Sequence, residues 1–169
     1  MKKILSELFQ SAKKQETETK KYFDRIKKKH PKNIDLIVKE LHEHVFQEID
    51  CLNCANCCKS ISPIITDKDI ERIAKHLKIK PSLFTEKYLH LDVENDYVFN
   101  DTPCPFLMTD NYCSIYENRP KACKEYPHTN SPNFIKRLNL TLKNTYYCPA
   151  VFKIIEKLKK EIIPIVNLK

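Results

Sequence analysis

The chain has 169 residues and a formal net charge of +8, with eight cysteines and no glycine. Its length fits one domain, or one domain with a helical extension, and allows a core that does not depend on disulfides. The lack of glycine excludes glycine-rich phosphate and dinucleotide loops and the Gly-x-Ser-x-Gly nucleophile elbow, and it leaves tight turns to Asn and Asp.

The N-terminal segment, residues 1–49, predicts a helical region. Residues up to about position 30 form an amphipathic pattern that should end before Pro31, because proline disfavours helical geometry in the residue before it. A second helix is expected from Ile34 to Ile49, where apolar residues recur every three or four positions. The apolar positions of the first helix are Ile4, Leu5, Leu8, Phe9, Ala12, Tyr22, Phe23 and Ile26.

No apolar run in the sequence has the length of a signal peptide core or a transmembrane helix. We therefore expect a cytoplasmic protein without membrane insertion. Thiols in the cytoplasm stay reduced unless a metal holds them or catalysis cycles them. The eight cysteines are accordingly expected to bind metal rather than to form disulfides.

Two short helices are expected after the first group of cysteines. Thr66 and Asp69 have the spacing of a capping box, which predicts the start of one helix. The second helix should begin at Pro81, a residue well suited to a first helical turn. The side chains that it should turn inward are Leu83, Phe84 and Tyr88.

Strands are predicted in three places. Residues 96–101 alternate between polar and apolar side chains, and residues 104–116 suggest two short strands around a turn at positions 109–111. Residues 133–144 alternate in the same way.

Two helices are predicted near the C-terminus. A short one carrying Cys123 fits between Pro120 and Pro127, and the last begins at Pro149. Together these elements predict a mainly α fold with a small β-hairpin, in which N- and C-terminal helices flank an irregular, cysteine-rich, metal-centred core.

The stretch CLNCANCC places four cysteines within eight positions. Two residues between cysteines let both sulfurs converge on one ion. Adjacent side chains on a helix point about 100° apart, so Cys57 and Cys58 are expected to serve different ions. The expected metal ligands are Cys51, Cys54, Cys57, Cys58, Cys104, Cys113, Cys123 and Cys148.

The spacing does not assign these ligands to sites or choose the metal. Two four-thiolate sites or one larger cluster fit the count, and redox-active thiols or buried cysteines are the alternatives. Zinc would be structural, whereas an iron–sulfur cluster would use the same thiolates. A proline follows Cys104 and Cys148, as one follows a ligand in bacterial ferredoxin runs, and we favour iron–sulfur for that reason.

No catalytic residue can be assigned. Tyr116 and Arg119 are candidates for binding a substrate or tuning a cluster, but the preferred interpretation is that they anchor their turn to the core.

These segments resemble the CxxCxxCC cysteine-cluster family, whose members are described as chelating zinc or iron. The resemblance covers Cys51 to Cys148 and implies a metal-binding domain over residues 50–169 that forms one compact unit with the N-terminal region. Lys124 and Tyr126 stand where the family usually has arginine and phenylalanine. The matching segments are CLNCANCC, CPFL, CSIYENRPKAC, EYP and the final Cys148.

The cofactor is expected to be an iron–sulfur cluster or Zn²⁺, and three functions follow. The first is electron transfer or redox support for a partner enzyme. The second is a structural zinc protein that binds a partner or a nucleic acid, and the third is metal storage or delivery. A protein partner is expected. Nucleic acid has weaker support, because no aromatic residues interleave with the basic runs and thiolates around two divalent ions would lower the net charge to about +4.

Overall fold

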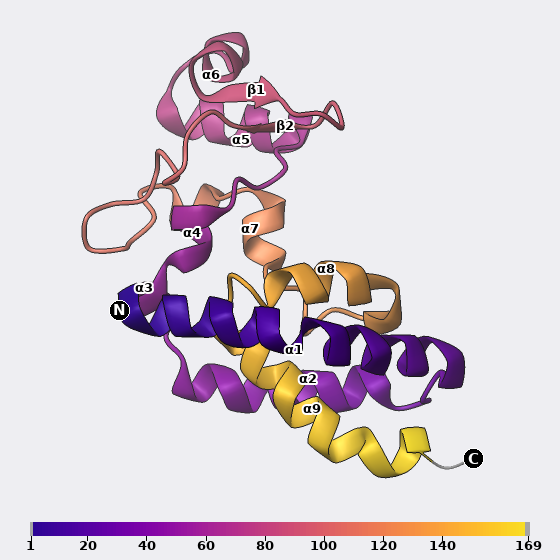
Figure 1. The fold of residues 1–169 in the computed structure, drawn as a ribbon. Helices are drawn as coiled ribbons and strands as arrows, with labels where there is room; N and C mark the ends of the chain where they lie inside the picture. Colours follow the sequence, from indigo (N-terminus) through magenta and orange to yellow (C-terminus); the bar gives the residue numbers. More distant parts are fainter. Residues whose placement is uncertain (1, 168–169) are drawn as a thin grey trace. The chain divides into compact units, whose positions relative to one another are not determined.

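The computed structural model describes the backbone of residues 2–167 and the side chains of residues 7–161. The described chain is mainly helical and has one two-stranded antiparallel sheet, which confirms the predicted fold class (Figure 1). It divides into two compact units. We call residues 1–50 and 127–169 the helical unit, and residues 51–126 the cysteine unit.

The helical unit begins with the two predicted amphipathic helices. Helix α1 (Lys2–Lys29) ends before Pro31, and helix α2 (Ile34–Glu48) follows it. Both helices bury most of the expected face, with Ile26 and Val38 fully buried, but Phe9 is 45% exposed. The side chains of Ile4 and Leu5 lie outside the described residues. The other buried residues of that face in α1 are Leu8, Ala12, Tyr22 and Phe23.

Residues 133–144 are helical, so the predicted strand is wrong. They form the 3₁₀ helix η2 (Phe134–Arg137) and helix α8 (Leu138–Asn144). The buried positions are Phe134, Leu138 and Thr141, which have helical spacing, whereas Leu140 is exposed. The alternating leucines suggested a strand. The segment instead forms helices that bury one face and leave Leu140 in solvent.

Helix α9 (Pro149–Asn167) begins where predicted and completes the helical unit, in which it packs against α1 and α2 (Figure 1). The Tyr22 hydroxyl in α1 donates to the carbonyl oxygen of Leu158 at 2.9 Å. The core combines side chains from all five elements, including Ile26, Val45, Phe134, Leu138, Val151, Ile154, Ile155 and Leu158. None of the described helices is long and apolar enough to cross a membrane.

The cysteine unit contains the two predicted central helices. Helix α5 (Asp67–Leu77) starts with a complete capping box between Thr66 and Asp69, as expected. Helix α6 (Pro81–Tyr88) buries Phe84 fully but leaves Leu83 47% exposed, so the inward placement of Leu83 is wrong. Adjacent residues lie about 100° apart on a helix, and an eight-residue helix with one packed face buries one of them.

The sheet pairs β1 (Leu89–Leu91) with β2 (Tyr97–Phe99), with Leu89 opposite Phe99. Strand β2 confirms the prediction for residues 96–101, whereas β1 was not predicted. The second predicted hairpin is reduced to a single bridge between Leu107 and Cys113 around a tight turn. Figure 1 shows the sheet beside α5 and α6. The core of this unit includes Ile65, Ile70, Ile73, Phe84, Leu89, Phe99, Phe106 and Ile115.

Turns without glycine use asparagine, as predicted, but other residues also adopt left-handed backbone. Asn95, Asn111 and Asn133 have φ values of 63°, 68° and 61°. Ala55 and Lys78 also have positive φ, at 46° and 57°. A left-handed conformation costs such residues about 1–2 kcal/mol, so packing and capping must hold them there.

Candidate metal centre

The CxxCxxCC motif folds as two short helical segments with a bend between them. Helix α3 (Cys51–Cys54) is separated from α4 (Asn56–Ser60) by the left-handed Ala55. The amide of Ala55 donates to the carbonyl oxygen of Cys51 at 2.7 Å. Ala55 is buried while Cys51 is exposed. The bend therefore separates the first cysteine pair from the second.

Cys57 and Cys58 bring their sulfurs together. Their Sγ atoms lie 3.9 Å apart, although adjacent helical side chains diverge at Cβ. A hydrogen bond from Cys57 is the main cause that lowers the pKa of Cys58 to about 7, against the effect of burial. The ammonium group of Lys59 lowers that pKa further. Cys58 is thus the thiol of this pair that is readily ionised near neutral pH.

Three cysteines from later in the chain gather around Cys58. The amide of Cys104 donates to the carbonyl oxygen of Cys58 at 2.8 Å, which joins the two segments directly. Cys113 follows the tight turn that the Leu107–Cys113 bridge closes. Cys123 lies in helix α7 (Lys121–Glu125), the short helix predicted between the two prolines.

The electrostatics show that these thiols share one neighbourhood. Burial is the main cause that raises the pKa of Cys104 to about 11 and the pKa of Cys123 to about 12. Burial also raises the pKa of Cys113. For all three thiols, negative charge on Cys58 raises the pKa further. One ionised sulfur among several protonated thiols is an arrangement that a cation can convert into a thiolate site, since metal ligands deprotonate on binding.

Comparison with protein families matches residues 50–149 to the CxxCxxCC family, described as "Putative zinc- or iron-chelating domain". The match covers more than half of the chain. The chain belongs to the CxxCxxCC family. No curated protein and no solved structure matches it. The family assignment establishes a cysteine-rich domain of the zinc- or iron-chelating class, and the resemblance seen in the sequence is confirmed.

The donor set of the CxxCxxCC domain fits a metal of that class. All eight cysteines are thiols rather than disulfides, and seven of them lie in the cysteine unit. Among the described residues, no three Cys, His, Asp or Glu side chains are already grouped around a common point as metal ligands. Chelation by three or more thiolates thus requires side-chain rotation from the positions seen. Cys57 and Cys58 already have the separation of two thiolates on one ion, which is about 3.8 Å for tetrahedral metal–sulfur bonds of about 2.3 Å.

Cys148 lies in the helical unit, directly before α9. It is partly buried and packs against the core of that unit. Its amide donates to the carbonyl oxygen of Asn144 at 2.9 Å. Cys148 therefore packs against the core of the helical unit, and its ligation of a metal stays a prediction of the family pattern.

Tyr116 and Arg119 contact each other within their own turn, and Tyr116 is 39% exposed, so their anchoring of the turn to the core stays a prediction. The Arg119 guanidinium donates from Nη1 to the Tyr116 carbonyl oxygen at 2.8 Å and lies 3.8 Å from the Tyr116 ring centre. Tyr112 stacks on Tyr116 with ring centres 5.6 Å apart. The charge of Arg119 also lowers the pKa of Cys113 and Cys123, against the larger effect of burial. Arg119 therefore contacts Tyr116 within its turn and also tunes the pKa of two thiols.

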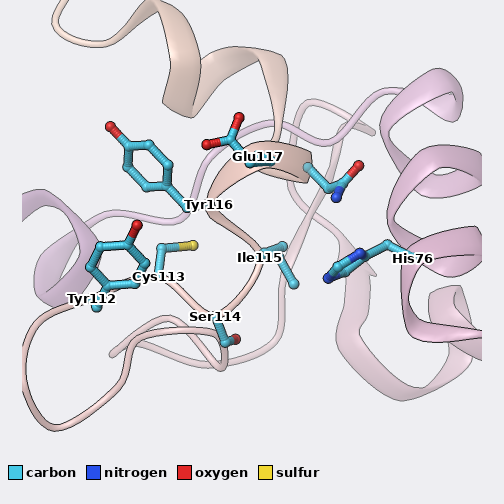
Figure 2. A pocket seen from close by; sticks show the side chains of 8 residues that line it. His76, Tyr112, Cys113, Ser114, Ile115, Tyr116 and Glu117 are labelled. Carbon is cyan, nitrogen blue, oxygen red and sulfur yellow. The ribbon is translucent and has the colours of Figure 1, made fainter.

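A shallow pocket of about 200 Å³ opens beside Cys113. Figure 2 shows Cys113, Tyr112 and Tyr116 on one side of it and His76 on the other, beyond Ile115. His76 lines this pocket from helix α5, and no sequence spacing relates it to Cys113. Cys113 lines this pocket and is partly exposed.

Asp69 contacts the segment that carries Cys123, and local sequence patterns did not identify this contact. The capping box predicted its contact with Thr66, which the structure confirms. Its other carboxylate oxygen, Oδ1, accepts a hydrogen bond from the amide of Lys121 at 3.0 Å, at the start of the helix that carries Cys123. The two residues lie 52 positions apart, and no local signal predicts such a bond.

Proposed function

We propose that the cysteine unit binds iron through its thiolates as an iron–sulfur cluster, and that the protein carries electrons or supports a redox reaction of a partner enzyme. The observation that carries this proposal is the 3.9 Å separation of the Cys57 and Cys58 sulfurs beside three further thiols. Cys104, Cys113 and Cys123 are the ligands proposed to complete the site. Cys51, Cys54 and Cys148 remain candidates from the motif.

Two thiolates on one iron suit a two-iron cluster. A [2Fe–2S] centre with four cysteines places two on each iron, whereas a [4Fe–4S] centre spreads four cysteines over four irons. Cys57 and Cys58 would bind one iron, in place of the separate ions expected from their divergence on a helix. Two of the three later cysteines would bind the other.

The protein's own residues prepare this site for a cation. Cys58, with a pKa near 7, supplies a thiolate before any metal is bound. The thiols of Cys104 and Cys123 must lose protons on binding, so chelation should strengthen as the pH rises. Lys59 and Arg119 offset part of the negative charge that the thiolates accumulate.

The test is the content of iron, zinc and acid-labile sulfide in protein purified without oxygen, together with its absorption spectrum. Iron and sulfide in similar amounts are expected, with loss of colour in Cys57→Ser and Cys58→Ser. Lys124→Ala is the matched control, because this exposed side chain lies beside Cys123 and should leave the metal unchanged. A colourless, iron-free wild type would overturn the proposal.

Structural zinc is the second candidate, because the same sulfur separation fits a tetrahedral zinc ion. Zinc without sulfide in the same measurement would select it.

If zinc is structural, the function would lie in binding a partner. A nucleic acid is one such partner, bound by the basic N-terminal helices. Lys27 and Lys28 are exposed at the end of α1. Replacing both by Glu should weaken binding to RNA in a salt-dependent way. Unchanged RNA affinity would remove that role.

A cytoplasmic location and a protein partner belong to this proposal. The eight thiols without disulfides suit a reducing compartment. A redox role requires a protein that donates or accepts the electrons. Storage or delivery of metal would instead give more than two ions per chain, with rapid exchange to a chelator.

A further inference from the structure

We propose that Asp69 is a positioning residue of the metal centre, which holds the Cys123 helix in place from helix α5. This inference rests on the proposed metal-binding function and adds a residue to it that donates nothing to the metal. Asp69 is only 1% exposed, and each of its carboxylate oxygens accepts two hydrogen bonds.

The two oxygens of Asp69 serve different elements. Oδ2 accepts from the amide and the hydroxyl of Thr66, at 3.0 and 2.7 Å, and so completes the capping box of its own helix. Oδ1 accepts from the amide of Lys121 at 3.0 Å and from the guanidinium of Arg72. Capping of α5 requires only Oδ2. Oδ1 instead holds the amide of Lys121, the first residue of α7, two positions before Cys123.

Arg72 extends this hold to a second point of the same segment. Its Nη2 group donates to the carbonyl oxygen of Arg119 at 3.0 Å while it also pairs with Asp69. Asp69 and Arg72 thus bind the backbone of residues 119 and 121, on either side of the buried Pro120. The chain that joins Cys113 to Cys123 is thereby fixed against a helix that contributes no cysteine.

The chemistry of the site explains why this position matters. The ligand segments are short and irregular, and Cys123 lies on a helix of five residues. Such a helix is not stable alone. A metal site depends on groups that hold its ligands in the productive geometry, and loss of such groups commonly costs 10- to 100-fold in metal affinity.

The experiment weakens the Asp69–Lys121 hydrogen bond from either end in the full-length chain. Asp69→Asn removes the charge and leaves one acceptor oxygen for the four donors that the carboxylate accepts from, and Lys121→Pro deletes the donating N–H together with the lysine side chain. Proline suits the first position of a helix, and Pro120 already has the extended backbone (φ −50°, ψ 150°) that a following proline requires. Lys121→Ala is the matched control, because it removes the same side chain and keeps the N–H.

The measurement is Zn²⁺ affinity of the metal-free protein, by competition with a chromophoric chelator without oxygen. Asp69→Asn and Lys121→Pro should each lower the affinity about 10-fold or more, while Lys121→Ala stays within about twofold of wild type. Thiolate-to-metal charge-transfer absorption with Co²⁺ should also fall in the first two variants, since one thiolate is misplaced. Loss of stability alone would not change that absorption per bound ion.

A second control addresses general destabilisation. Asp35 accepts from the amides of Asn133 and Phe134 in the helical unit, at 2.7 and 2.9 Å. Asp35→Asn should lower the melting temperature without changing Zn²⁺ affinity. An equal loss of affinity in Asp35→Asn would overturn the positioning role, as would wild-type affinity in both test variants. If Asp69→Asn does not fold, the Zn²⁺ affinity of Lys121→Pro decides whether the hydrogen bond positions Cys123. A wild type that binds neither Zn²⁺ nor Co²⁺ would overturn the proposed function instead.

Discussion

Cys58 differs from its neighbours in the state of its thiol. Its pKa is lowered to about 7, while burial raises that of Cys104 to about 11 and that of Cys123 to about 12. The cause is local, because Cys57 is adjacent and Lys59 follows directly. The sequence predicted all of these cysteines as ligands but did not rank them. The order of their pKa values depends on how deeply each thiol is buried and on which other thiols lie near it.

This difference predicts selective alkylation of the metal-free protein. Near neutral pH, Cys58 should form the nucleophilic thiolate more readily than Cys104 and Cys123, so iodoacetamide should modify it before those two. Cys104 and Cys123 should react far more slowly at that pH. Peptide mass spectrometry over a time course measures the order of modification, and Lys59→Ala should slow Cys58 by raising its pKa. Faster reaction of Cys123 than of Cys58 would contradict the assignment.

At the scale of elements, most helices follow from periodicity, and the exceptions have physical causes. The capping box at Thr66 and the helices that begin at Pro81 and Pro149 are confirmed. The strand predicted over residues 133–144 is wrong, because Phe134 and Leu138 pack on one helical face that alternating leucines conceal. Strand β1 has three residues and gains its ladder only through β2, so no pattern within it could predict it.

The network around Asp69 predicts an acid-sensitive contribution to stability. Burial acts to raise the pKa of Asp69, but the hydrogen bonds from Thr66, Arg72 and Lys121 outweigh it and hold the pKa below its usual value. Because the folded-state pKa is lower than that of the unfolded chain, the carboxylate stabilises the fold fully above about pH 4 and loses this effect as the pH falls through the folded-state pKa.

Urea unfolding of wild type and Asp69→Asn as a function of pH measures this contribution. At pH 7 the variant should be less stable by about 1.5–3 kcal/mol, the usual worth of hydrogen bonds to a charged group. The difference should shrink as the pH falls below about 4. Asp67→Asn, an exposed carboxylate on the same turn, should change stability by less than about 0.5 kcal/mol. A difference that stays constant with pH would show that charge on Asp69 is not the cause.

At the scale of the whole molecule, the two units rely on different sources of stability. The helical unit has a core drawn from all of its helices. In the cysteine unit, the core lies among α5, α6, the sheet, Phe106 and Ile115. The motif itself, residues 51–60, buries only Ala55. We therefore expect the segments that carry cysteines to gain order when metal binds, since binding free energy becomes folding free energy in such sites.

Removal of metal should accordingly loosen one unit selectively. Hydrogen exchange of metal-loaded and chelator-treated protein should show faster amide exchange in residues 51–60 and 104–126. Protection in α1, α2 and α9 should be unchanged, because the side chains that pack these helices together belong to their own core. Apo protein prepared from Cys58→Ser provides a control without chelator. Equal loss of protection in both units would contradict this separation.

The sequence by itself determined the cysteine inventory, the family, the starts of α2, α5, α6 and α9, and most of the buried faces of α1 and α2. Each of these depends on residues that are close together in the chain, where periodicity, capping and spacing act. Only the tertiary structure decided which thiols lie near Cys58. It alone also decided that Asp69 accepts a hydrogen bond from the amide of Lys121, 52 positions away. It also decided that Cys148 packs into the helical unit. Contacts between distant residues depend on how whole elements pack, and no local pattern encodes them.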